Sequence, residues 1–188
     1  AAMTGTPDLQ LWQISAQIIL GWQRALAGDT AGLIQLRDSL DQMAELKGRN
    51  RYQRPVLWYS DACIELGELN AAEDYLDQCL VIARERTTLF LPELATQLAK
   101  VRDLLGHPAN EVKALAEMAI NQAREHGNRH QELAALELWL TRIEPNDQQA
   151  KESFRRLLSE VSHSDAPVLT RWISLLDRRL PHPVSIES

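Results

Sequence analysis

Turn-forming residues recur along this chain at a fixed interval of 39 positions. They are Gly28, Gly67, Gly106 and Pro145. An apolar residue stands twelve positions after each of them. These residues are Leu40, Cys79, Met118 and Leu157. A helical hairpin repeated four times explains this register, because one hairpin cannot bury its apolar face alone and has to stack on its neighbours. The register therefore predicts an all-α repeat protein.

The spacing also predicts where the domain lies. We expect one domain at residues 8–180. Its four hairpin units are predicted at about 8–47, 52–86, 88–127 and 129–161, and a C-terminal capping helix at 166–180. A solenoid needs such a final helix to cover its last apolar surface. Residues 1–7 are interpreted as a leader, in keeping with a piece of a longer polypeptide, and residues 181–188 as a flexible tail.

Composition narrows the class of partner. The net charge is −6 and the isoelectric point is near 5.4, so the chain lacks the basic balance with which proteins usually neutralise nucleic-acid phosphates. No stretch approaches eighteen consecutive apolar residues. We therefore expect a cytoplasmic protein that binds neither nucleic acid nor membrane. Cys63 and Cys79 fill apolar positions, which favours buried reduced thiols over a disulfide.

The second unit resembles a tetratricopeptide repeat in five positions: small Ser60, turn residue Gly67, small Ala72, large Leu76 and small Cys79. Gly21 and Ala99 match Ser60 in other units, whereas Leu138 departs from the pattern, and the period exceeds the usual 34 residues. The longer period and short phrases such as Ala27-Gly28-Asp29 and Leu104-Leu105-Gly106-His107-Pro108 resemble particular arrays. These are the C-terminal arrays of bacterial ATPase-containing transcriptional regulators of the LuxR and maltose-regulator type, and of adenylate or guanylate cyclases.

This resemblance implies a right-handed superhelical solenoid that serves as a sensor or scaffold, with ATPase and output domains upstream. The residues themselves offer no glycine-rich phosphate loop and no spaced Cys/His metal signature. His126 and His130 are four apart, but Gly127 and Asn128 stand between them at an expected helix end. We therefore expect no enzymatic activity and no cofactor or metal in this segment.

The resemblance places one column of the concave surface at four positions that are 39 residues apart. They are Trp22, Asp61, Lys100 and Trp139. Arg54, Glu93 and Glu132 form a second column at the rim. This surface is a candidate groove for a peptide or a small ligand, because aromatic and arginine side chains often dominate binding surfaces. Alternatively, the two tryptophans pack between helices, and Asp61 and Lys100 pair across a repeat interface. Trp12, Trp58 and Trp172 are assigned to packing.

Two functions follow from these patterns. The first is a protein-interaction and regulatory module that binds a protein or peptide, a second copy of itself or a neighbouring domain of the same polypeptide. The second is a small-molecule sensor that holds an effector in the concave groove. A closed and partly apolar pocket would favour the sensor, whereas an open groove or a two-fold contact would favour the interaction module.

Overall fold

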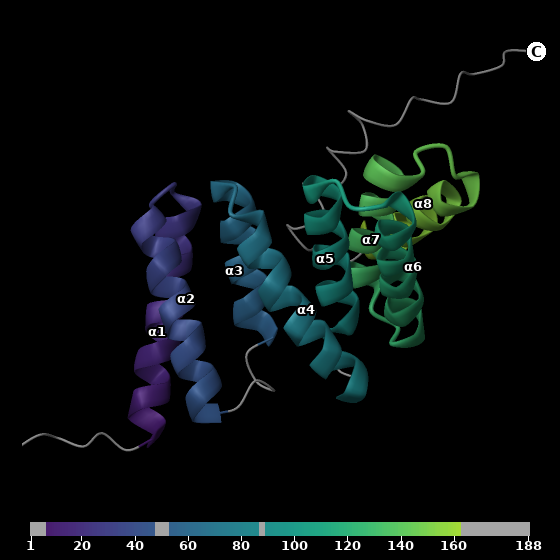
Figure 1. Cartoon of the computed structure of the whole chain (residues 1–188). Helices are drawn as coiled ribbons and strands as arrows, with labels where there is room; N and C mark the ends of the chain where they lie inside the picture. The colour runs from purple at the N-terminus through teal and green to yellow at the C-terminus, as the bar shows by residue number, and fades with distance from the viewer. Residues whose placement is uncertain (1–6, 48–52, 87–88, 163–188) are drawn as a thin grey trace, which may run out of the picture.

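The computed structural model describes residues 7–47, 53–86 and 89–162, and these residues are helical with no strand. The elements are α1 (Pro7–Leu26), α2 (Thr30–Lys47), α3 (Gln53–Leu66), α4 (Leu69–Arg86), α5 (Leu91–Leu105), α6 (Ala109–Glu125), α7 (Arg129–Leu138), the π-helix η2 (Trp139–Ile143) and α8 (Gln148–Ser162). Figure 1 shows α1 and α2 at one end of the molecule and α8 towards the other. The predicted leader, the capping helix at 166–180, Trp172 and the tail lie outside the described residues.

Three of the four predicted turn residues end a helix in the left-handed conformation. Gly28, Gly67 and Gly106 have φ angles of 88°, 79° and 76°. Glycine adopts this conformation without the steric cost of a Cβ atom, and it therefore ends helices frequently. The fourth turn contains Pro145 and separates η2 from α8. The predicted helix breaks are confirmed at these positions.

Side-chain caps start the helices that follow two of these turns. The Ala31 N–H donates to Asp29 Oδ1 at 2.9 Å, and the Ala150 N–H donates to Asp147 Oδ1 at 3.0 Å. Each bond satisfies one of the backbone donors that a helix start leaves free. These bonds also lower the pKa of both carboxyl groups; for Asp29 the larger cause is the hydrogen bond from Arg24.

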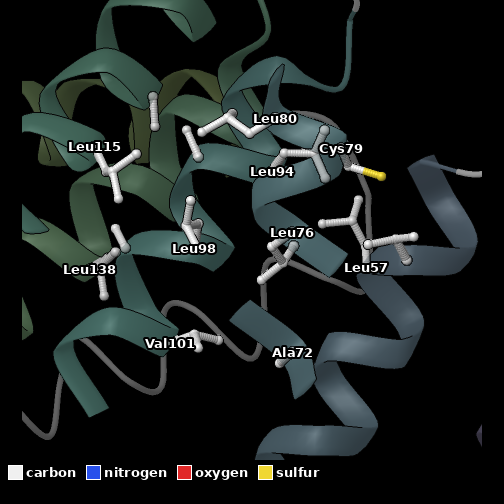
Figure 2. Close-up of a cluster of buried hydrophobic side chains, with 14 of the residues drawn as sticks. Leu57, Ala72, Leu76, Cys79, Leu80, Leu94, Leu98, Val101, Leu115 and Leu138 are labelled. Atoms are coloured by element: carbon white, nitrogen blue, oxygen red, sulfur yellow. The ribbon is translucent and has the colours of Figure 1, made fainter. Parts of the chain in front are cut away.

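Consecutive helices pack against each other, and α1 with α3, α3 with α5, and α5 with α7 are also in contact. Their shared core contains the large apolar residues predicted from the register: Leu76 is 0% exposed and Leu115 is 6% exposed. Figure 2 shows both in one cluster with side chains from α3, α4, α5 and α7. Cys63 and Cys79 are buried free thiols, and burial raises the pKa of Cys63 to about 12.

The structure differs from the sequence-based expectation at both ends of the array. Trp12 was predicted to pack, and this prediction is wrong: Trp12 is 74% exposed, because no described helix covers its side of α1. The last turn of the seventh helix is a π-helix, which the sequence did not indicate. The Glu144 N–H bonds to the Trp139 carbonyl, five residues earlier, at 2.8 Å. Among the described helices, none combines the length and hydropathy that crossing a lipid bilayer would need.

Candidate functional site

From the second hairpin onward, the first helix carries polar side chains that bond to the first helix of the next hairpin. The guanidinium of Arg54 on α3 donates to Glu93 Oε1 on α5 at 2.7 Å and lies 5.1 Å from the ring centre of Phe90. Gln131 Nε2 on α7 donates to the other oxygen of Glu93 at 3.3 Å. Glu93 therefore links three successive first helices, and within the predicted rim column of Arg54, Glu93 and Glu132 it bonds directly to Arg54.

A second set of polar contacts surrounds Asp61 and Lys100, two of the predicted column residues. Gln97 Nε2 on α5 donates to Asp61 Oδ1 on α3 at 2.6 Å. Burial raises the pKa of Asp61, and the Gln97 hydrogen bond and the charge of Lys100 oppose that rise. The structure thus brings Asp61 and Lys100 together electrostatically across adjacent repeats. Apart from its charge interaction with Asp61, Lys100 has no hydrogen bond or ion pair among the described residues, and it is half-buried.

Lys100 lines a partly open pocket of about 230 Å³ between α5 and the α7–η2 segment. The lining residues are Thr96, Lys100, Ala134, Glu137, Leu138, Thr141 and Arg142. Arg142 also donates to Asp103 Oδ2 at 3.3 Å, from one first helix to the next. Two cationic side chains, the Glu137 side chain and two threonine side chains therefore stand around one small depression. This chemistry suits a carboxylate, because ammonium and guanidinium groups form the stronger, charge-assisted hydrogen bonds.

The π-helix contributes Thr141 and Arg142 to this pocket. A π-helical turn contains one more residue than an α-helical turn, and such turns occur often at functional sites. The extra residue changes the direction of the side chains after Trp139 relative to a regular α-helix. Arg142 consequently meets both Asp103 and the pocket.

The structure places the two predicted aromatic residues of the column between helices. Trp139 is 6% exposed; its Nε1 donates to Asp147 Oδ2 at 3.0 Å, and the Lys113 ammonium lies 5.3 Å from its ring centre. Trp22 is half-buried and stacks on Trp58, with ring centres 5.2 Å apart. Both tryptophans therefore connect neighbouring helices, and neither lines the pocket.

The remaining candidates for chemistry have structural partners. Glu132 is 6% exposed and accepts a hydrogen bond from Arg124 at 2.5 Å. His126 caps the end of α6 and His130 lies in α7, so one continuous helix does not align them. Within the described ranges, no three His, Cys, Asp or Glu side chains are grouped closely enough to hold a metal ion.

Sequence reasoning missed Thr96, Thr141 and Arg142. One signal pointed to Arg142: it stands 39 residues after Asp103 and has the opposite charge. Nothing in the sequence indicated the π-helix that brings Thr141 to the same place. Comparisons of this chain with protein-family models, with curated proteins and with solved structures found no match.

Proposed function

We propose that this chain is a non-catalytic, tetratricopeptide-like interaction domain of a larger cytoplasmic bacterial signalling or transcriptional regulatory protein. Its partner is an acidic, extended segment of another protein or of a neighbouring domain. The pocket between α5 and α7–η2, with Lys100 and Arg142 on its wall, is the observation that carries the proposal. Arg54 and Asp61 belong to the same surface.

The packing pattern supports a right-handed solenoid. Each first helix contacts both its own second helix and the next first helix, as α3 contacts α4 and α5. Stacked hairpins with this pattern build an elongated surface from their first helices. The hydrogen bonds from Arg54 to Glu93 and from Gln131 to Glu93 run along that surface. They hold its side chains in place before a partner arrives, which lowers the entropic cost of binding.

Charge favours an acidic partner. The chain carries a net charge of −6, and Arg142 at the pocket is bonded to Asp103, so Lys100 is the pocket's cation with no ion pair among the described residues. The Lys100 ammonium lacks a direct partner among the described residues, whereas Arg54, Arg102 and Arg124 each have a carboxylate within 2.8 Å. A carboxylate of the binding partner that enters the pocket would form an ion pair with the Lys100 ammonium.

The size of the pocket favours the interaction module over the small-molecule sensor. Pockets for small ligands are typically about 300 to 1,000 Å³ and bury most of the ligand. The pocket here measures about 230 Å³ and is partly open. The volume of the pocket suits a single acidic side chain of a longer segment better than a whole small-molecule effector. The sensor stays as the alternative, and a rise in melting temperature with small mono- or dicarboxylates would support it.

A labelled peptide tests this proposal. The probe is a fluorescent octapeptide of alternating aspartate and leucine, and its counterpart of alternating lysine and leucine is the first control. We expect the acidic peptide to bind, and Lys100→Gln or Arg142→Gln to weaken its binding about tenfold, the size of one lost charge-assisted contact. Lys151→Gln, which removes a cation from α8, leaves the affinity unchanged. Equal binding of the two peptides, or unchanged affinity after Lys100→Gln, contradicts the proposal.

A further inference from the structure

Helix α1 is apolar on two opposite faces. Its inner face packs on the core through Ile14, Ile18, Gly21 and Ala25, which are buried. At 3.6 residues per turn, the opposite face carries a second apolar row. The exposed fractions of its large side chains are 55% for Leu9, 74% for Trp12, 43% for Ile19, 54% for Leu20 and 43% for Leu26. A surface helix usually carries polar residues on the face opposite the core, so this second apolar row is unusual for an exposed helix.

This outer row is also uncharged. No Asp, Glu, Lys or Arg stands between Leu9 and Gln23, although 24% of the whole chain is charged. Terminal units of stacked repeats usually present a polar outer surface to water. The α1–α2 hairpin lies at the end of the molecule in Figure 1, and its helix α1 exposes large apolar side chains instead.

The spacing of the row matches a helix-pairing seam. Alternating steps of three and four residues connect its members, and these steps define the a and d positions of paired helices. The members are Leu9, Trp12, Ala16, Ile19, Gln23 and Leu26. The single polar member is an uncharged glutamine. This pattern fits a second helix that lies along the whole of α1.

We propose that the partner of this face is α1 of a second copy of the chain, in antiparallel orientation about a two-fold axis. About such an axis, a residue i that contacts residue j of the other copy has its own counterpart contacted by residue j of the first copy. The row is self-complementary in this arrangement: Leu9 faces Leu26, and small Ala16 faces larger Ile19. Trp12 faces Gln23, whose amide needs no counter-ion. The absence of charge means that the axis brings no like charges together.

The area reaches the size that such a dimer needs. A fully covered aromatic side chain buries on the order of 200 Å², and with this as an upper value for each large side chain, Leu20 beside the row included, the exposed fractions above leave at most roughly 500 Å² of apolar surface per copy. Two copies together bury up to about 1,000 Å², the lower bound for a specific interface. The pocket at Lys100 lies on α5, α7 and η2. Dimerisation through α1 therefore leaves the proposed partner-binding pocket open and does not depend on it.

Sedimentation velocity or light scattering of the full chain over a concentration series tests the dimer. We expect wild type to approach twice 21.3 kDa and Trp12→Glu to remain at the single-chain mass. The matched control is Val81→Glu, which places the same charge at a 56% exposed position of α4 and leaves the dimer intact. Circular dichroism checks that both variants stay helical. Wild type at the single-chain mass up to its solubility limit, or a dimer that survives Trp12→Glu, overturns the proposal.

Cysteine cross-linking tests the orientation. In the antiparallel pair, position 9 of one copy lies opposite position 26 of the other, within disulfide reach. The double variant Leu9→Cys with Leu26→Cys should therefore form a covalent dimer on oxidation, whereas Leu9→Cys alone should not. The two native cysteines are buried and 0% exposed, so they do not interfere. A covalent dimer from Leu9→Cys alone indicates parallel helices and overturns the antiparallel arrangement.

Discussion

At Gly32 on α2, the absence of a side chain allows two helices to touch. An added Cβ would lie 2.6 Å from Arg24 Cβ and 2.7 Å from the Ala25 backbone nitrogen, and a Cβ on Gly21 would lie 2.9 Å from the Gly32 carbonyl oxygen. These distances are shorter than van der Waals contact, and most of the atoms involved are backbone atoms that cannot move aside. The two glycines therefore set the distance between α1 and α2.

This close approach predicts the sign of a mutation. Replacing a glycine by alanine in a helix interior normally raises the free energy of unfolding by about 0.5 to 1 kcal/mol. For Gly32→Ala, overpacking should instead lower it by about 1 to 3 kcal/mol. Gly28→Ala is the comparison, since its Cβ would meet no atom within 4 Å and only the left-handed φ of 88° opposes it. Urea denaturation measures both. A stabilised Gly32→Ala variant would show that α1 and α2 lie further apart.

At the scale of one element, Asp147 connects the end of η2 to the start of α8. Its Oδ1 caps α8 and its Oδ2 accepts from the Trp139 indole. These bonds favour the carboxylate and hold the pKa of Asp147 below its usual range. A lowered pKa means that the carboxylate stabilises the fold above its unfolded pKa of about 3.9, and this contribution is lost as the pH falls through the folded value.

Asp147→Ala should therefore cost about 1 kcal/mol of unfolding free energy at pH 7, as other cap losses do. The difference between wild type and this variant should shrink as the pH falls below about 4, where the unfolded carboxylate takes up a proton, and on through the lower pKa of the folded state. Asp147→Asn is the control, because the amide oxygen still caps the helix without a charge. Urea titrations at several pH values measure the difference. A difference that stays constant down to pH 3 contradicts the assignment.

The helices and their breaks could be predicted from the sequence because local chemistry determines them. Gly28, Gly67 and Gly106 end helices through their backbone freedom, and Asp147 starts one through its side chain. The pocket could not be predicted in full, because its residues come from α5 and from a π-helical turn whose hydrogen bonding is not set by local residue type. The sequence left open whether Trp22 and Trp139 line a groove or pack between helices, because their partners come from segments distant in sequence or beyond a turn: Trp22 stacks on Trp58 and Trp139 bonds to Asp147.

For the whole molecule, the 39-residue register creates one surface from separate hairpins. Arg54 with Glu93 and Asp103 with Arg142 are both ion pairs between residues 39 apart, so equivalent positions on successive first helices meet repeatedly. The proposed partner site lies on this surface near the middle of the array, and the proposed dimer contact lies on α1 at its end (Figure 1). The two interactions can therefore occur together.

Nuclear magnetic resonance titration with the acidic octapeptide tests the central claim, that the surface of the first helices at Lys100 and Arg142 holds an acidic segment. We predict that the largest amide shift changes fall on α5 and on α7–η2, around Thr96, Lys100 and Thr141, and that Lys100→Gln needs about tenfold more peptide to reach the same changes. Changes centred on α2, α4 or α6, or an unchanged peptide affinity in Lys100→Gln, would contradict the account.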